Sequence, residues 1–252
     1  MGNLFIENQT QYDFFDTADG SPSICLSSDM FRPEAMHHRQ GALTESLFVY
    51  HGVLKEALER ECPPQILSVG LGCGYNEMIT VAHFLNTETG LPVDFYLESF
   101  EGDLQLRQVF NNWLIDQAPD SPLEKSLSDT FERVSLLVAE HFFVEHELLK
   151  ATLRDLIEAK KINIREWLTT ETDFSYRFGV IYFDAFSGKS TPELWTEDFL
   201  FNFLARASAP QSGLATYAAT GALNRALKRS GFILKEQPGF SGKRQSTRAF
   251  RS

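Results

Sequence analysis

Asp184 is the first residue to consider, because its type and its position in the chain suit chemistry on a bound ligand. It directly follows a short apolar run, Gly179–Phe183, that is typical of a buried strand. Open α/β sheets bind ligands at the carboxyl ends of such strands, where a carboxylate can accept a hydrogen bond from a substrate and orient it. An aspartate in this place is also common as the cap of a strand-to-helix turn. For Asp184 alone that second interpretation is favoured, so the rest of the chain has to decide.

A glycine-rich turn follows an earlier apolar run, Gln65–Val69. Gly70, Gly72 and Gly74 stand at alternate positions, and residues 75–85 then have helical spacing. Glycine lets the backbone turn sharply and approach a ligand closely, because no Cβ fills the space. The spacing is neither that of a phosphate-binding P-loop nor the G-x-G-x-x-G of dinucleotide-binding proteins. It favours S-adenosylmethionine (SAM), which has no phosphate to place at a helix N-terminus.

A carboxylate at the end of the next strand can bind the ribose of an adenosine cofactor. Residues 93–101 predict this strand, and Glu101 lies at its end. A side chain there reaches the crevice and can accept hydrogen bonds from both ribose hydroxyls. Glu98 is the alternative, but a residue inside the strand points into one face of the sheet. We therefore expect Glu101 to hold the ribose.

A polar residue near a third strand can contact the adenine. Asn163 lies at the tip of a short strand predicted at residues 162–164, where its side chain can meet the adenine amino group. Glu140 is the alternative, because it follows residues 134–139, a further candidate strand. The sequence leaves both residues open.

The remaining patterns predict how these residues are positioned. Apolar spacing predicts helices at residues 42–60, 75–85, 104–115, 142–160, 196–207 and 220–230, and one helical turn at residues 165–168. Further strands are predicted at residues 4–6, 23–26, 213–217, 232–236 and 245–251. Strands that alternate with helices and end in a hairpin predict an α/β fold, a Rossmann-like doubly wound, mostly parallel sheet with a C-terminal antiparallel strand. A small N-terminal extension would precede it.

The charge of the chain limits its partners. The formal net charge is −11, which argues against a protein that coats nucleic acid non-specifically. The C-terminal fifth differs, because the sequence after Asp198 contains nine basic residues and one acidic residue, Glu236. A basic face on an acidic body can hold a polyanion in one orientation, or it can be an ordinary solvated surface.

Several classes of protein are excluded by what the sequence lacks. Cys25, Cys62 and Cys73 are widely spaced and form neither a disulfide framework nor a metal site. The pair His37 and His38 alone is a poor metal site, so we expect no metal. No apolar run approaches the ~20 residues that span a membrane, and no leader peptide is recognisable at the N-terminus. We expect a cytoplasmic protein that does not bind membranes.

The order of these elements resembles that of class I SAM-dependent methyltransferases. More narrowly, it resembles the family that makes 5-methylaminomethyl-(2-thio)uridine at the tRNA wobble position, MnmD or the N-terminal part of MnmC. The matching stretches are Gly41–Ser46, Gly74-Tyr75-Asn76, Phe100-Glu101, Arg165-Glu166, Asp184–Trp195 and Gly242-Lys243-Arg244. The departures are Asn163 for an aspartate, Gly188 for a proline and Gln245 for a glutamate.

The resemblance implies methyl transfer from SAM to the exocyclic amine of an aminomethyl-uridine in the anticodon region of tRNA. It implies a methyltransferase domain at residues 61–252 after an extension at residues 1–60, and no flavin domain in this chain. Asp184 would orient the amine, and Phe186 would stack on the flipped uracil or simply fill the core. The implied cofactor-binding residues are Gly70, Gly72, Gly74, Tyr75, Asn76, Glu101, Asn163 and Asp184. The implied RNA-binding residues are Glu45, Ser46, Lys189, Lys243 and Arg244.

Two alternatives remain beside this hypothesis. The chain can be a SAM methyltransferase with another amine or RNA substrate. It can also be a non-catalytic RNA-binding protein with the same fold, although Asp184, the three glycines and Glu101 argue against a chain that has lost its chemistry.

Overall fold

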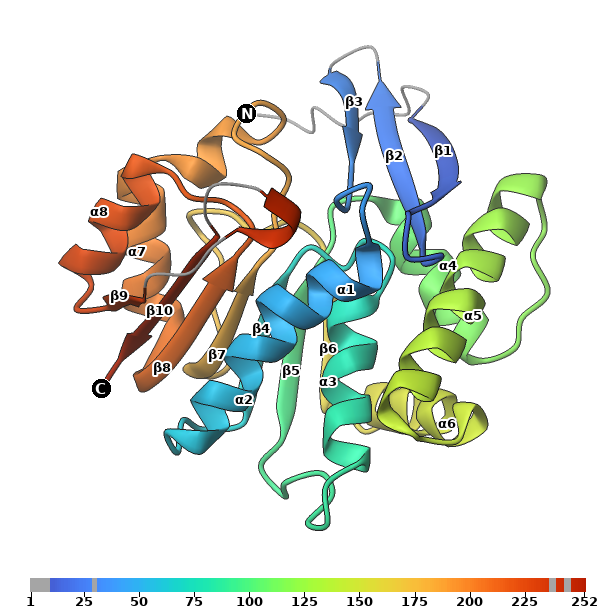
Figure 1. The fold of residues 1–252 in the computed structure, drawn as a ribbon, viewed down its shortest axis with the longest axis horizontal. Helices are drawn as coiled ribbons and strands as arrows, with labels where there is room; N and C mark the ends of the chain where they lie inside the picture. Colours follow the sequence, from blue (N-terminus) through green and yellow to red (C-terminus); the bar gives the residue numbers. More distant parts are fainter. Residues whose placement is uncertain (1–9, 29–30, 236–238, 243–245) are drawn as a thin grey trace.

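A seven-stranded sheet crosses the centre of the computed structural model, which describes residues 10–28, 31–235, 239–242 and 246–252 (Figure 1). The strand order is β6-β5-β4-β7-β8-β10-β9, and β10 runs antiparallel to both of its neighbours. The strands are β4 (Gln65–Val69), β5 (Tyr96–Phe100), β6 (Ile162–Arg165), β7 (Phe178–Phe183), β8 (Ser208–Thr216), β9 (Ile233–Lys235) and β10 (Thr247–Arg251). The predicted mostly parallel, doubly wound α/β fold is confirmed.

Helices cover both faces of this sheet, because successive residues of a buried strand point to opposite sides. In β4, Ile66 packs into one apolar core, whereas Leu67 and Val69 pack into the other. The first core is covered by α1 (Ala42–Ser46), α2 (Gly52–Glu59), α3 (Tyr75–Leu85), α4 (Leu104–Leu114), α5 (Pro122–Phe142) and α6 (His146–Glu158). The second is covered by α7 (Glu197–Ala207) and α8 (Gly221–Arg229).

Capping side chains fix where several helices begin. The Thr196 hydroxyl accepts a hydrogen bond from the Phe199 N–H at the start of α7, at 3.2 Å. The Thr220 hydroxyl does the same for the Leu223 N–H of α8. Such caps satisfy N–H groups that have no partner inside the helix. The helices predicted from Thr196 and Thr220 therefore begin at the capping residues that the sequence indicates.

A small antiparallel sheet lies above α1 in Figure 1. Its strands are β1 (Gln11–Asp16), β2 (Pro22–Ser28) and β3 (Phe31–Ala35). The turn between β1 and β2 is tied to α1, because Asp19 Oδ2 accepts hydrogen bonds from the backbone N–H and the hydroxyl of Thr44. The strand predicted at residues 23–26 is part of β2, whereas the one predicted at residues 4–6 lies outside the described residues.

Two local predictions are wrong. Residues 134–139 belong to the long helix α5, in which Phe131, Val134 and Val138 are buried at helical spacing; their apolar, β-branched run resembles a strand only when it is considered alone. No helical turn forms at residues 165–168, because Arg165 continues β6 in register with Phe100. The helix predicted at residues 142–160 is α6, which begins four residues later, after α5 ends at Phe142.

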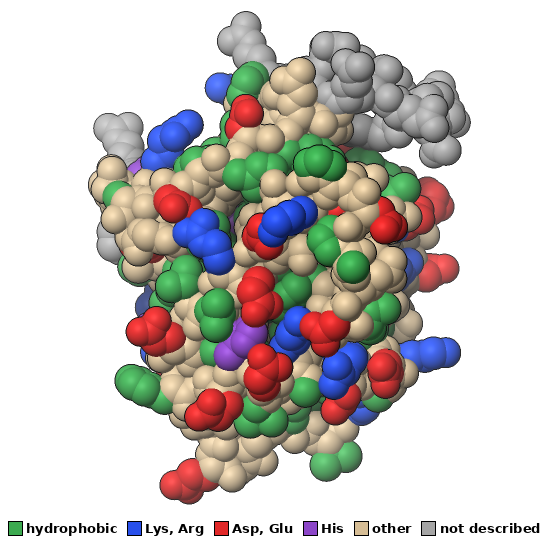
Figure 2. Space-filling model, turned by 90° about the vertical axis from the view of Figure 1, so that its right-hand side faces the viewer, with side chains coloured by type: hydrophobic (Ala, Val, Ile, Leu, Met, Phe, Trp, Pro, Cys, Tyr) green, Lys and Arg blue, Asp and Glu red, His purple; other side chains and the backbone are tan. Residues whose placement is uncertain are grey.

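Acidic and basic side chains intermix on the face that Figure 2 presents, to the right of Figure 1. Ion pairs on α5 and α6 are Lys125–Asp129, Arg133–Asp16 and Lys150–Asp116. This face therefore offers no surface of a single charge. No helix within the described ranges has the length and apolar content that crossing a bilayer requires.

Candidate active site

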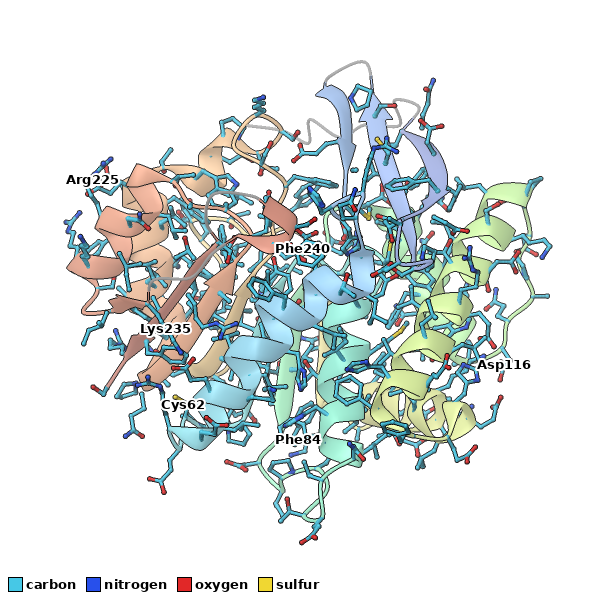
Figure 3. All side chains as sticks on the ribbon, in the orientation of Figure 1. Cys62, Phe84, Asp116, Arg225, Lys235 and Phe240 are labelled. Atoms are coloured by element: carbon cyan, nitrogen blue, oxygen red, sulfur yellow. The ribbon has the colours of Figure 1, made fainter. Side chains whose placement is uncertain are left out.

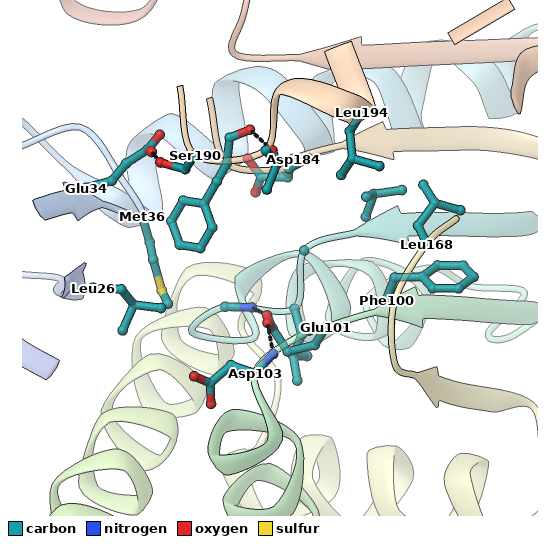
Figure 4. Close-up of a pocket in the computed structure, with 18 of the residues that line it drawn as sticks. Leu26, Glu34, Met36, Phe100, Glu101, Asp103, Leu168, Asp184, Ser190 and Leu194 are labelled. Carbon is teal, nitrogen blue, oxygen red and sulfur yellow. Dashed lines mark hydrogen bonds between the residues drawn. The ribbon is translucent and has the colours of Figure 1, made fainter. Parts of the chain in front are cut away.

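A cavity of about 1790 Å³ opens where the parallel strands end. Its walls come from the glycine turn after β4, the segment after β5, residues 166–170 after β6, and Asp184 and the segment that follows it after β7. The small sheet forms another wall with Glu34 and Met36 (Figure 4). This is the place at which an open α/β sheet binds its ligands.

The glycine turn has a backbone that other residues would not adopt. Gly70 has a φ of +106°, and a Cβ there would lie 2.7 Å from the carbonyl oxygen of Asp184. Gly74, at the start of α3, has a φ of +79°. Gly70 approaches Asp184 so closely because the Asp184 N–H donates to the Val69 carbonyl at 2.9 Å, which joins the ends of β4 and β7. The turn therefore needs glycine at position 70, and its backbone lies directly against Asp184, the residue expected to bind the acceptor.

The Glu101 carboxylate is fixed at the cavity wall by two backbone N–H groups. Its Oε2 accepts from Gly72 and its Oε1 accepts from Asp103, both at 2.9 Å (Figure 4). Burial raises the pKa of Glu101 to about 7, although both of these N–H donors lower it. Glu98 does not line the cavity, because it is buried inside β5 and bound by Arg165 and Tyr96.

The Asp184 carboxylate accepts one hydrogen bond on each oxygen. The Tyr50 hydroxyl donates to Oδ1 at 2.5 Å, and the Asn76 Nδ2 donates to Oδ2 at 3.0 Å. Burial raises the pKa of Asp184 well above its usual range, and the charges of Glu45 and Glu77 add to this effect, while Tyr50 and Asn76 oppose it. Asp184 is therefore a firmly held carboxyl group whose affinity for a proton is raised. Tyr50 was not predicted as a site residue.

Phe186 lines the same cavity and packs against the first core. Its backbone is held in place because its carbonyl oxygen accepts from Trp195 Nε1 at 2.7 Å and from the Thr191 hydroxyl at 2.8 Å. Glu45 also lines the cavity and accepts from the backbone N–H of His38 at 2.7 Å. Ser46 is buried in α1 and is not part of the cavity wall.

Glu34 of β3 holds the segment that follows Asp184. Its Oε1 accepts from the Ser187 N–H at 2.8 Å, and its Oε2 accepts from the Ser190 hydroxyl (Figure 4). The small sheet thus fixes one wall of the cavity although it is separate from the central sheet. This contact between separate sheets was not predicted from the sequence.

Replacing Glu34 by alanine is expected to loosen this segment. The Ser187 N–H would lose its acceptor, so its amide exchange with solvent should accelerate by about tenfold or more, which corresponds to the ~1.5–3 kcal/mol of a hydrogen bond to a charged group. Hydrogen exchange followed by mass spectrometry measures this. Replacing Glu193, an exposed residue of the same wall, is the control. Unchanged exchange at Ser187 in the Glu34 variant would show that the contact does not order the segment.

Several predicted residues lie away from the cavity. Asn163 sits inside β6, opposite Glu98, and does not line it, because the strand extends one residue further than predicted. Glu140 is exposed on α5, so neither candidate for adenine reaches the cavity. Lys189 is exposed outside the lining. Lys243 and Arg244 lie outside the described residues.

The other predicted residues that line the cavity come from several elements: Gly70, Gly72, Tyr75, Asn76, Glu101, Asp184, Phe186 and Glu45.

The basic residues of the C-terminal fifth mostly bind the chain's own acceptors. Of the seven that the structure describes, six contact carboxylates or carbonyl oxygens of this chain: Arg206, Arg225, Arg229, Lys235, Arg248 and Arg251. The charge count alone therefore overstates the surface that these residues offer to a polyanion.

Comparison with known proteins places this geometry in a family. A family of S-adenosyl-L-methionine-dependent methyltransferases matches residues 127–252, half of the chain. The chain belongs to this family. The fold also resembles the crystal structure of MnmC2 from Aquifex aeolicus, with a TM-score of 0.63 and 23% identity over 96% of this chain and 71% of that one.

Two curated relatives bear the name tRNA 5-methylaminomethyl-2-thiouridine biosynthesis bifunctional protein MnmC. The protein from Hahella chejuensis is 36% identical over 34% of this chain, and the protein from Campylobacter hominis is 24% identical over 82% of it. The matched regions are 13% and 28% of those proteins, so the methyltransferase chain corresponds to a minor part of their length.

SAM is the cofactor of this methyltransferase, and the cavity fits it. The glycine turn leaves room that a Cβ would fill, and the Glu101 carboxylate is held beside that turn with lone pairs to spare. Among the described residues there is no group of three or more His, Cys, Asp or Glu side chains suited to a metal ion.

Proposed function

We propose that this methyltransferase transfers the methyl group of SAM to the amine of 5-aminomethyl-(2-thio)uridine at the wobble position of tRNA. The observation that carries the proposal is the Asp184 carboxylate, held by Tyr50 and Asn76 against the glycine turn of the cofactor cradle. The names of the MnmC relatives support tRNA as the substrate.

Bound SAM supplies a methyl group on a positively charged sulfur. For transfer, the substrate amine must be neutral, with its lone pair in line with the methyl–sulfur bond at near-attack distance. The ionised Asp184 carboxylate accepts an N–H of this amine and so orients the lone pair. Transfer of the methyl group from sulfur to nitrogen would leave the nitrogen cationic, and the Asp184 carboxylate would then receive a proton from it, because burial raises the pKa of this carboxyl.

In this proposal SAM binds on one side of the cavity and the uracil of the tRNA binds on the other. Glu101 would accept the ribose hydroxyls, and the turn from Gly70 to Asn76 would face the amino-acid part. Residues 166–170, in place of Asn163, line the region where the adenine is expected. Phe186 would stack on the extruded uracil, as enzymes that modify a base require. Lys189 is exposed and available for phosphate.

A second candidate is methylation of a smaller cationic amine. The cavity wall carries nine carboxylates against two arginines, Arg39 and Arg107, a balance that favours a cation over a phosphate chain at its mouth. The nine carboxylates belong to Glu34, Glu45, Glu101, Asp103, Glu124, Glu166, Asp184, Glu193 and Asp198.

Methyl transfer from labelled SAM decides between these candidates. The acceptors are tRNA isolated from a strain that accumulates 5-aminomethyl-2-thiouridine, the same tRNA after the modification has been completed, and putrescine as a small cationic amine. Mass spectrometry of the nucleosides should show labelled 5-methylaminomethyl-2-thiouridine in the first sample alone. Transfer to putrescine without transfer to tRNA would favour the second candidate, and transfer to none of them would refute the proposed reaction.

Glu101→Gln is expected to raise the Kd for SAM by about tenfold to a hundredfold, because an amide cannot accept both ribose hydroxyls as a carboxylate does. In the wild type the affinity should increase as the pH rises through about 7, where Glu101 loses its proton. Isothermal titration calorimetry at pH 6 and pH 8 measures both effects. Glu140→Gln, exposed on α5 and outside the cavity lining, is the control. Equal affinity of wild type and Glu101→Gln would remove Glu101 from the cofactor site.

A further inference from the structure

The helix that precedes β4 is interrupted by a π-helical turn, η1 (Leu47–His51), between α1 and α2. The Gly52 N–H donates to the carbonyl of Leu47, five residues back, where an α-helix would bond four residues back. Such turns are rare in proteins, but those that occur are often located at functional sites. Tyr50 lies in this turn and is only 2% exposed. Its hydroxyl points into the protein and donates to Asp184.

An arginine from the last strand holds this turn. Arg248 of β10 donates from Nη2 to the Phe48 carbonyl at 2.9 Å, and its Nη1 lies 3.6 Å from Glu56. The guanidinium fits because residue 52 is glycine: a Cβ there would lie 2.1 Å from Arg248 Nη2. Phe240 also contacts the turn, with its ring 6.1 Å from that of Phe48 (Figure 3). Residues near the end of the chain thus support a turn almost 200 positions earlier.

We propose that η1 is a positioning device in which Gly52 and Arg248 hold the turn so that the Tyr50 hydroxyl fixes the Asp184 carboxylate toward the acceptor. Tyr50 does not meet the acceptor in this arrangement and acts through Asp184. The proposal rests on the role proposed above for Asp184, whereas the contacts of η1 are independent of which amine is methylated.

The Tyr50 contact also affects when Asp184 is ionised. A neutral donor on a carboxylate favours its charged form, and here it opposes the effect of burial. The other groups that face Asp184 are Glu45 from α1, Asn76 and Glu77 from α3, and Tyr217 after β8. Glu45 and Glu77 favour the neutral carboxyl through like charge. Once the Tyr50 hydroxyl is lost, Asn76 is left to oppose them and the effect of burial.

Tyr50→Phe tests the contact, and Tyr182→Phe is its matched control. Tyr182 is equally buried, and its hydroxyl pairs with Thr80 at 3.1 Å instead of Asp184. In protein labelled with [γ-13C]aspartate, the signal that Asp184→Asn removes is titrated by NMR. Tyr50→Phe should raise the pKa of Asp184 by about one unit and move the acidic limb of the kcat–pH profile up by the same amount, with the Kd for SAM within about threefold of wild type. Tyr182→Phe should change neither.

Gly52→Ala and Arg248→Lys test the support of the turn, with Lys235→Ala as the control. Lys235 (Figure 3) pairs with the same Glu56 at 2.8 Å without contacting η1. The first two variants should reproduce the titration shift of Tyr50→Phe, and Lys235→Ala should not. An Asp184 titration in Tyr50→Phe identical to wild type would overturn the proposal. Failure of wild type to methylate aminomethyl-uridine tRNA would refute the proposed substrate instead, since the NMR titration needs no acceptor.

Discussion

Asp184→Ala is expected to lower kcat for methyl transfer by a factor of about 10²–10⁴, the usual contribution of a positioned group that handles a proton. The amine would lose the acceptor that orients its lone pair, and Tyr50 and Asn76 would face a cavity in place of a carboxylate. The Kd for SAM should stay within about tenfold, or 1.4 kcal/mol, because Glu101 and the glycine turn, which are proposed to bind the cofactor, are unchanged. Single-turnover transfer from labelled SAM and calorimetry measure the two quantities separately.

Two further variants separate the charge of Asp184 from its shape. Asp184→Asn keeps a carbonyl oxygen near Tyr50 but cannot take a proton, so its rate should fall nearly as far as that of the alanine variant if the proton matters. Asp198→Asn, at an exposed residue of the same cavity wall, should leave kcat within about twofold, as is usual for a surface substitution. A wild-type rate in Asp184→Ala would disprove the assigned role.

The fold was predictable because its patterns are local. The central parallel strands β4 and β7 are short, mostly apolar runs. Gly70 and Gly74 mark backbone that only glycine readily adopts. Because parallel strands end at one edge of the sheet, the same patterns also bring the glycine turn, Glu101 and Asp184 together. Gly70, Gly72, Glu101 and Asp184 line one cavity.

Contacts between distant segments could not be predicted in this way. The spacing of residues 42–60 predicts that Tyr50 is buried, but a π-turn has no local pattern, and the arginine that holds it lies in β10. Glu34 reaches the segment after Asp184 from a separate sheet. Asn163 shows a different limit: the strand extends one residue further than predicted, and Asn163 lies inside it and outside the cavity lining.

Glu77 provides the second large effect, and it concerns stability. This residue of α3 is completely buried, and its Oε1 accepts from the hydroxyl of Ser99 in β5 at 2.7 Å. Burial raises the pKa of Glu77 to about 7 from a value of 4.5. Because the folded state holds this proton more tightly than the unfolded chain, the contribution of Glu77 to stability is complete below pH 4.5 and is lost as the pH rises through about 7.

Glu77→Gln is therefore expected to be increasingly favourable relative to wild type as the pH rises. The amide mimics the protonated carboxyl and does not titrate, so its advantage in the free energy of unfolding should grow by up to about 3 kcal/mol between pH 5 and pH 8. Urea unfolding at the two pH values measures this difference. Glu140→Gln, exposed on α5, controls for the change in net charge and should alter the free energy by less than about 0.5 kcal/mol at either pH. If the difference between Glu77→Gln and wild type were the same at both pH values, Glu77 would have to be ionised in the folded protein throughout this range. The Glu77 carboxylate in α3 would then be a permanent negative charge near Asp184.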